Sequence, residues 1–318
     1  LGQGAMLAGG YFAAQCLSFL RNAIIGHALS KGDFGVAATI TLILQLIEMI
    51  SDMGSDRLIV QATDGASDLM LASSHTILVL RGLLVCAILF VAGPLLARLF
   101  DVPTAALTFQ LAGVASLIRG FTHLDWRRAQ RRLDNGPHLA IEIVPQAVSL
   151  AATVPMVIFV GGYSAVVWLS IVQALTAVTV SHALTRSSYR LGFDRDMLKR
   201  QIAFGWPILA SALPLTAVYQ FDRIVIGGAM GVEALANYTV AFLATMIPGI
   251  LAAKVGHALM LPVFSTSRRT SGSLRLPFEP MAEGVVVIAA MYLVGFIICG
   301  EHLLPLTFGQ NYVGLGVV

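Results

Sequence analysis

The feature that most constrains this chain is a succession of long apolar runs separated by short polar segments. A hydrocarbon core about 30 Å thick is crossed by roughly 20 helical residues. Lipid offers no hydrogen-bond partners to the backbone, so such runs are expected to be helices. We expect spans over 4–29, 34–53, 75–100, 104–124, 138–160, 163–184, 201–226, 232–261 and 281–300, with a tenth that begins near Leu303.

The composition fits a protein that lies in a membrane. Of its residues, 57% are hydrophobic and 12% are charged, and the mean hydropathy is +0.82, whereas soluble domains carry about 25% charged residues. The sequence therefore predicts an all-α integral membrane protein. Its three cysteines (Cys16, Cys86 and Cys299) lie in apolar runs without metal-ligand spacing, so they are expected to behave as small apolar side chains.

No pattern of residues indicates an enzyme, a cofactor or a metal. The sequence contains no Gly-x-Ser-x-Gly, no phosphate-binding glycine-rich loop and no His-Glu-x-x-His. The prediction is a protein that is not an enzyme and has no cofactor. A polytopic glycan enzyme stays open as an alternative, although such an enzyme would usually need a large outward loop, and the outward loops expected here are short.

Lys and Arg are distributed unevenly between the alternate loops. One set of loops holds thirteen of the twenty, the other set holds only Lys31 and Arg98, and five lie within the expected spans. Because Lys and Arg favour the cytoplasmic side, the N-terminus is expected to be cytoplasmic. Binding of nucleic acid is not expected, because basic loops beside spans are ordinary topology signals that also contact anionic lipid.

Two stretches of the chain repeat weakly at a spacing of 201 residues. Identical residues recur in the pairs Ile25 and Ile226, Gly26 and Gly227, and Ala28 and Ala229. Polar residues recur at the same spacing, and on a helix they share one face. This polar stripe contains Gln15, Ser18, Arg21 and Asn22 in the first run and Thr216, Tyr219, Asp222 and Arg223 in the seventh. We interpret the chain as two similar lobes that turn polar stripes toward a shared space.

The second run carries a polar stripe of its own, whereas the matching face of the eighth run is apolar. Its members lie at helical spacing (Thr41, Gln45, Glu48 and Asp52). Ionisable side chains at membrane depth usually face a water-filled cavity or a partner. Gln45 and Glu48 therefore join the candidate cavity residues, and Glu48, Asp52 and Asp222 are candidates for ion coupling.

Two interpretations of these polar residues remain open. Either they line a hydrophilic pathway for an anionic substrate, because guanidinium groups suit phosphate, or they pair only for packing, with Arg21 on Glu48 or Asp52. Arg81, Arg119 and Lys254 lie within two turns of the cytoplasmic ends of their runs, and we interpret them as reaching toward lipid headgroups.

The charged segments divide the chain into lobes. We expect an N-terminal six-helix transmembrane lobe over 1–185, a basic cytoplasmic linker over 186–200 and a C-terminal transmembrane lobe over 201–318. We expect the second lobe, with about four helices, to be incomplete and the chain to be a fragment of a protein with twelve or more spans.

Short motifs along nearly the whole chain resemble those of one family. They are Lys31-Gly32-Asp33-Phe34-Gly35, Asp52-Met53-Gly54, Gln130-Arg131-Arg132-Leu133 with Ile141-Glu142, Phe204-Gly205-Trp206-Pro207, and Asp222-Arg223 with Gly231 and Tyr238. In their order and spacing the chain resembles the polysaccharide-biosynthesis flippases, the O-antigen and exopolysaccharide translocases, whose superfamily also contains the multidrug and toxin extruders.

The resemblance implies two pseudo-symmetric helix bundles around a central cavity. It implies alternating access that carries an undecaprenyl-pyrophosphate-linked oligosaccharide across the bacterial cytoplasmic (inner) membrane for export of lipopolysaccharide or exopolysaccharide. The partners so implied are this lipid-linked oligosaccharide, membrane lipids and other polysaccharide assembly proteins. The alternative within transport is an ion-coupled exporter of drugs or other small molecules from the same superfamily.

Overall fold

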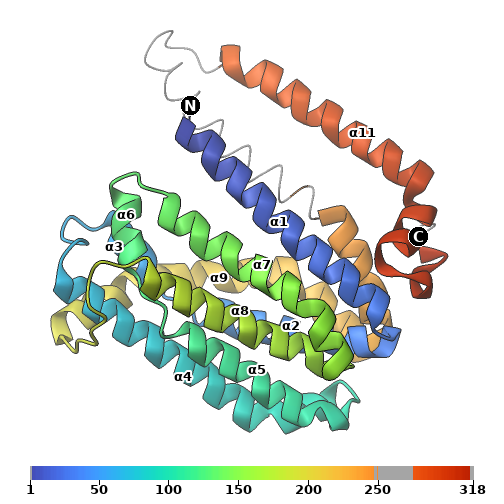
Figure 1. Ribbon diagram of the computed structural model, residues 1–318, viewed down its shortest axis with the longest axis horizontal. Coiled ribbons are helices and arrows are strands. Elements are labelled where there is room, and N and C mark those ends of the chain that lie inside the picture. The colour runs from blue at the N-terminus through green and yellow to red at the C-terminus, as the bar shows by residue number, and fades with distance from the viewer. Residues whose placement is uncertain (1, 247–248, 250–274, 316–318) are drawn as a thin grey trace. The chain divides into compact units, whose positions relative to one another are not determined.

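The computed structural model describes residues 2–246, 249 and 275–315, and every element of regular structure in these ranges is a helix (Figure 1). The helices form two compact units. The larger unit comprises Leu29–Thr239, and the smaller unit comprises Leu1–Ala28 with Val240–Val318.

The elements follow the expected alternation of apolar and polar segments. The larger unit contains α2 (Lys31–Ile50), α3 (Ser55–Gln61), α4 (Asp68–Leu99), η1 (Pro103–Ala105), α5 (Ala106–Arg119), α6 (Asp125–Arg131), α7 (Gly136–Phe159), α8 (Ser164–Ala183) and α9 (Arg195–Ala229). The smaller unit contains α1 (Gly2–Ala28), α11 (Arg275–Phe308) and η2 (Gln310–Tyr312). A helix over Val232–Met246 begins in the larger unit and ends in the smaller one.

Six helices of the described residues are long and apolar enough to cross a membrane. They are α2, α4, α7, α8, α9 and the Ala282–Phe308 part of α11. α1 is 27 residues long but is not among them. The helix Val232–Met246 covers only part of the eighth expected span, and most of the rest, to residue 261, lies outside the described residues.

Three expected boundaries were wrong. α5 ends at Arg119 after 14 residues, about 21 Å of helix, because the turn that begins at Gly120 starts earlier than expected. α9 begins at Arg195 rather than Gln201, because the Asp194 carboxylate accepts hydrogen bonds from the first free backbone N–H groups. α11 continues through Leu303 to Phe308 without the break expected after Gly300.

The core of the larger unit forms where α5 packs against both α4 and α8. Buried side chains from α2, α4, α5 and α8 meet there, among them Ile40, Leu89, Phe109 and Val167. The helices approach closely because small residues face the contact. A Cβ atom on Gly113 of α5 would lie 2.9 Å from the Cα of Cys86 on α4.

α2 packs against α9 in the antiparallel direction, with a glycine contact near each end. At the start of α2, a Cβ on Gly35 would lie 2.0 Å from the carbonyl oxygen of Val232. Just beyond its end, Met53 lies against Gly205 of α9, where a Cβ would lie 2.6 Å from the Met53 carbonyl oxygen. Only glycine fits at these two positions, so Gly35 sets the approach of α2 to the start of the Val232–Met246 helix, and Gly205 sets the approach of α9 to the turn after α2.

In the smaller unit, α11 packs against the end of α1. The rings of Phe19 and Phe308 meet edge to face with centroids 5.7 Å apart, a favourable arrangement of aromatic rings. A Cβ on Gly26 would lie 3.0 Å from the Phe308 ring. Most of α11 is exposed within the described structure.

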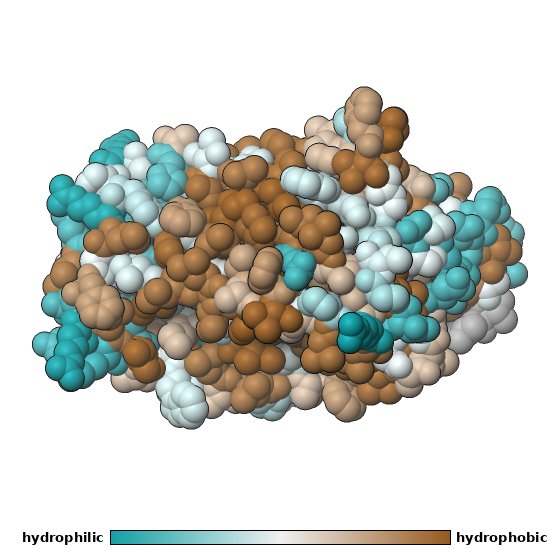
Figure 2. All heavy atoms as spheres, turned by 90° about the horizontal axis from the view of Figure 1, so that it is seen from below, coloured by the Kyte–Doolittle hydropathy of each residue, from teal (hydrophilic) through white to brown (hydrophobic). Residues whose placement is uncertain are grey.

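The surface of the larger unit is that of a membrane protein. Brown apolar side chains cover the middle of the face shown in Figure 2, and teal hydrophilic ones gather toward both of its ends. Large apolar side chains of α4 are strongly exposed, as Phe90, Val91 and Leu95 show at 64%, 80% and 69%. Such exposure is expected where lipid is the solvent, since a soluble surface rarely holds an apolar patch of this extent.

The basic loops gather at one end of the larger unit. α3, α6 and the linker between α8 and α9 lie together there (Figure 1). Of the thirteen basic residues assigned to one side, Arg268 and Arg269 lie outside the described residues. The membrane side that this end faces, and the lobe boundaries 1–185, 186–200 and 201–318, stay predictions.

The contact at Gly35 can be tested by substitution. Gly35→Ala is expected to destabilise the protein by at least about 1–3 kcal/mol, the usual cost of an overpacked core, because the added methyl group would overlap the Val232 carbonyl. The measurement is the free energy of unfolding in detergent. Gly228→Ala, at a helical glycine with open space around its Cβ position, is the control and should be neutral or slightly stabilising. Equal stability of the two variants would contradict the contact.

Candidate functional site

The predicted polar residues fall in both units. The cavity residues of α1, namely Gln15, Ser18, Arg21 and Asn22, are half-buried on one continuous helix of the smaller unit. The others lie on α2 and α9 of the larger unit: Gln45, Glu48, Thr216, Tyr219, Asp222 and Arg223. A shared pathway that joins the two sets stays a prediction.

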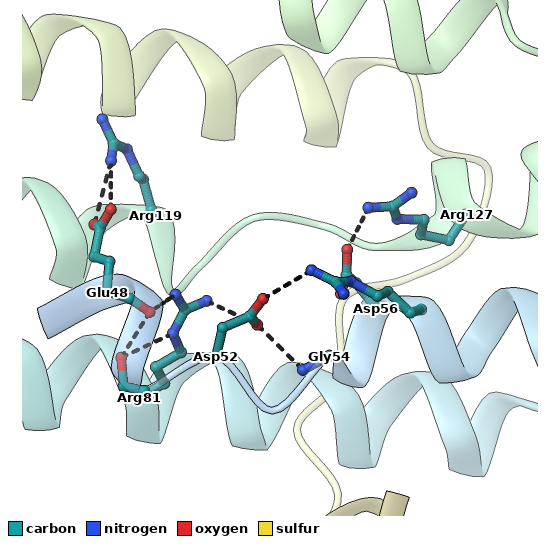
Figure 3. A network of polar contacts seen from close by, with 9 residues as sticks. Glu48, Asp52, Gly54, Asp56, Arg81, Arg119 and Arg127 are labelled. Carbon is teal, nitrogen blue, oxygen red and sulfur yellow. Dashed lines mark hydrogen bonds and ion pairs between the residues drawn. The ribbon is translucent and has the colours of Figure 1, made fainter. Parts of the chain in front are cut away.

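The carboxylate of Glu48, near the end of α2, is bound by an arginine of α5. Arg119 Nη1 lies 3.2 Å from both carboxylate oxygens of Glu48 (Figure 3). The Arg119 side chain is 37% exposed and the Glu48 side chain is 20% exposed. A half-buried pair of this kind neutralises two charges that would each be costly alone.

Asp52, just beyond the end of α2, organises the turn into α3. Its Oδ1 accepts a hydrogen bond from Gly54 N at 3.1 Å, and Gly54 adopts the left-handed conformation with φ 59°, which glycine adopts without strain. The carboxylate also pairs with two arginines, at 3.3 Å from Arg57 Nη2 and 3.5 Å from Arg81 Nη1. The Asp-Met-Gly motif is therefore a turn as well as a charge centre.

Arg81 of α4 ties the end of α2 to α4. Its Nη2 donates to the Glu48 carbonyl oxygen at 2.6 Å, and its Nε donates to Ser51 Oγ at 3.2 Å. The Glu48 carbonyl also accepts a hydrogen bond from the Ser51 hydroxyl at 3.1 Å, so Arg81 adds a second donor at this end of α2. The interpretation of Arg81 and Arg119 as groups that reach lipid headgroups was therefore wrong, because each is held by an acidic residue of α2 or its turn (Figure 3). Lys254, which was interpreted in the same way, lies outside the described residues.

A second polar cluster connects α9 to the helix Val232–Met246. The Tyr238 hydroxyl donates to Asp222 Oδ2, and Arg223 Nη1 lies 3.4 Å from Gln220 Oε1. Sequence reasoning included Tyr238 in a motif but missed it as the partner of Asp222. The spacing of 16 residues across a turn gives no helical signal for such a pair.

The other predicted residues differ in their environments. Thr216 is buried, Gln45 is exposed, and Tyr219 is 58% exposed. Thr216 and Tyr219 were predicted to share one stripe with Arg223. Of these three side chains on α9, only Thr216 is buried. An ion-coupling role for Glu48, Asp52 or Asp222 is untested.

The Gln-Arg-Arg-Leu motif also has a structural role. Arg131 of α6 donates to the backbone carbonyl oxygens of Ile59, Val60 and Thr63 at 2.9, 3.0 and 3.3 Å, and also to that of Ala62. These carbonyls lie at and just beyond the end of α3, where they lack helical partners. Asp56 of α3 pairs with Arg127 of α6 (Figure 3), so α3 and α6 are fastened together.

Three histidines form a cluster that sequence reasoning did not find. The ring of His123, in the loop between α5 and α6, lies 4.8 Å from that of His75 and 5.3 Å from that of His182, between centroids. Burial of His123 disfavours its charged form, and together with the nearby His182 it holds the pKa of His123 below its usual value. Among the described residues, no group of His, Cys, Asp and Glu could hold a metal ion.

The fold, with its long apolar helices, defines a multi-pass membrane protein that is helical throughout the described residues. The chain superposes on a transporter titled as an inward-facing multidrug resistance MATE family member of the MOP superfamily with a TM-score of 0.74 at 14% identity, over 95% of this chain and 74% of that one. It also matches a MATE structure in a bent conformation, with a TM-score of 0.59 at 13% identity, over 99% and 77% of the two chains. These likenesses confirm the predicted MATE-like helical fold.

A family profile then places the chain more narrowly. Residues 24–315 match the profile described as polysaccharide biosynthesis protein, and the chain belongs to this family. It is 20% identical to the teichuronic acid biosynthesis protein TuaB of Bacillus subtilis (strain 168) over 311 residues, and 20% identical to the lipopolysaccharide biosynthesis protein WzxC of Escherichia coli (strain K12) over 308 residues. Each match covers 93% of this chain but only 62% and 60% of the relatives. The resemblance found in the sequence is confirmed.

The pairing of Glu48 with Arg119 can be measured by a double-mutant cycle. Glu48→Gln and Arg119→Gln should each destabilise the protein, whereas the double variant should lose less than their sum, with a coupling of about 1–2 kcal/mol for a half-buried pair. The measurement is the free energy of unfolding in detergent. Arg98→Gln, at an exposed position of α4, replaces Arg119→Gln in a control cycle that should show no coupling. If the losses of unfolding free energy in Glu48→Gln and Arg119→Gln simply add in the double variant, the ion pair is contradicted.

The histidine cluster predicts a pH dependence of stability. Unfolded histidine has a pKa near 6.5, and the pKa of His123 is lower in the folded protein. Below about pH 6.5 the unfolded state therefore binds more protons, and stability falls as the pH falls toward the folded pKa. His123→Asn removes the titration while its Oδ1 can still accept from Asp125 N. Thermal unfolding between pH 8 and 5 should vary less in this variant, and an unchanged profile would contradict the assignment.

Proposed function

We propose that the protein moves a lipid-linked oligosaccharide, with undecaprenyl pyrophosphate as its lipid carrier, across the bacterial inner membrane for surface polysaccharide export. Alternating access is the mechanism in this proposal. The main observation in support of this proposal is the match of residues 24–315 to the polysaccharide biosynthesis family, in a chain with a MATE-like fold. The names of two relatives, which concern teichuronic acid and lipopolysaccharide, support a glycan as cargo.

Two arginines fit the proposed cargo. Arg21 of α1 and Arg223 of α9 are half-buried cations on long helices. A guanidinium group donates two parallel hydrogen bonds to phosphate oxygens, which suits a pyrophosphate better than a neutral drug. In this proposal, both arginines face the pathway of the cargo, and Asp222 with Tyr238 orients the α9 side.

An ion-coupled exporter of small molecules is the second candidate. It is favoured by the likeness to a structure titled as a multidrug transporter and by the three carboxylates of Glu48, Asp52 and Asp222. In such a protein, protonation or sodium binding at a carboxylate would couple to export. The two candidates differ in cargo, so glycan transport separates them.

The test is complementation in bacteria that lack their own oligosaccharide flippase, with surface polysaccharide as the readout. The full-length gene should restore surface glycan in a host with a matching glycan. Arg223→Ala should reduce it by about tenfold or more, equivalent to about 1.4 kcal/mol of lost binding, because a charge-assisted contact with the pyrophosphate disappears. Arg21→Ala is tested beside it with the same expectation.

The control is Arg98→Ala, which removes an exposed arginine at the end of α4. It should leave surface glycan unchanged, and immunoblots of membranes should show equal amounts of all variants. Full activity of Arg223→Ala would remove this residue from the pathway. Failure of the wild type in several glycan backgrounds, with the protein present in the membrane, would favour the exporter.

A further inference from the structure

The linker between α8 and α9 is fastened along the start of α4. Gly192 N donates to Ala72 O at 3.2 Å, and the Thr76 hydroxyl donates to Gly192 O at 2.8 Å. A Cβ on Gly192 would lie 2.8 Å from that of Ala72. The polar backbone of the linker is therefore satisfied by α4, and its position is set by direct contact.

A single buried imidazole strengthens this attachment. Leu124 N donates to His75 Nε2 at 3.1 Å, so Nε2 carries no proton, and Nδ1 can donate to the carbonyl oxygen of Arg190 at 3.1 Å. The ring of Tyr189 stacks on His75 with centroids 4.4 Å apart. His75 thus joins α4, the loop before α6 and the linker.

One side of the linker is turned toward α4, and several of its side chains are exposed. Phe193 is 80% exposed and Leu191 is 56% exposed, so the anchored segment presents two large apolar side chains to its surroundings. Exposed cations flank them (Arg186, Arg190, Arg195 and Lys199). The carboxylate of Asp194, which lies among them, accepts bonds from the first turn of α9.

The level of this segment is fixed by its neighbours. α8 ends at Ala183 and α9 begins at Arg195, and both helices are long and apolar enough to span a membrane. The linker therefore connects two helices that are each long and apolar enough to cross a membrane, which favours a place near the membrane boundary. It shares this end of the larger unit with α3 and α6 (Figure 1).

We propose that residues 186–195 form a docking strip for anionic phospholipid. Phe193 and Leu191 enter the boundary between headgroups and acyl chains, where amphipathic segments place their apolar side chains. Arg186, Arg190 and Arg195 lie against the lipid phosphates, since basic residues beside a span attract anionic lipid. The matching of exposed apolar and basic groups at the membrane boundary favours a lipid surface over a protein partner. This proposal does not depend on the transported cargo.

The test places a fluorescent probe in the strip of the full chain. Phe193→Trp is made after the three native tryptophans are replaced by Phe (Trp126, Trp168 and Trp206), and the protein is reconstituted in nanodiscs of phosphatidylcholine and phosphatidylglycerol. Lipids brominated near the headgroup end of the acyl chain should quench the new indole, whose emission should shift to shorter wavelength. Gln61→Trp, at an exposed polar position at the end of α3, should be quenched mainly by aqueous acrylamide.

The role of charge is tested in the same protein. Combined Arg186→Gln, Arg190→Gln and Arg195→Gln should lower lipid quenching at least twofold in phosphatidylglycerol nanodiscs and leave it nearly unchanged in pure phosphatidylcholine. High salt should have the same effect without any arginine substitution, so the test survives if the triple variant does not fold. Equal quenching in both lipids at low and high salt would overturn the preference for anionic lipid. Two outcomes would overturn the docking strip. In one, only acrylamide quenches the Trp at position 193. In the other, neither acrylamide nor brominated lipid quenches it, as expected if a protein partner covers it.

Discussion

The larger unit depends on how its arginines are satisfied beside apolar helices. Arg119 binds the Glu48 carboxylate, Arg81 reaches both the Asp52 carboxylate and helix-end acceptors, and Arg131 binds carbonyls at the end of α3. A charged group removed from water is tolerated only with a partner. The same bonds therefore neutralise the charges and hold α2, α4, α5, α3 and α6 in register at one end of the unit.

Close helix contacts provide the second constraint. Gly35 brings the start of α2 against the Val232–Met246 helix, Gly205 brings α9 against the turn after α2, and Gly113 brings α5 against α4. In a protein whose outer surface faces lipid, association of helices relies on such packing, because exchange of lipid for another apolar surface gives little driving force. Several motif residues that indicate the family thus make turns and contacts.

The sequence predicted most of the fold because each signal is local. Apolar runs located α2, α4, α7, α8 and α9, and the family resemblance predicted the MATE-like fold. The misplaced boundaries have local causes too: Asp194 caps α9 six residues earlier than expected, and α11 passes through Gly300 because a single glycine weakens a long apolar helix without ending it. The candidate residues on α1 were found by spacing, but spacing gives no distances between helices.

The sequence by itself determined the membrane class, the helical elements, the family and which polar residues stand out in apolar runs, because hydropathy and periodicity are properties of neighbouring residues. Only the tertiary structure decided the partners: Arg119 for Glu48, Tyr238 for Asp222, and the buried imidazole of His75 for the linker carbonyl of Arg190. These groups are separated by 71, 16 and 115 residues. Their pairing depends on how the helices pack and where the turns bring the backbone, which no local pattern records.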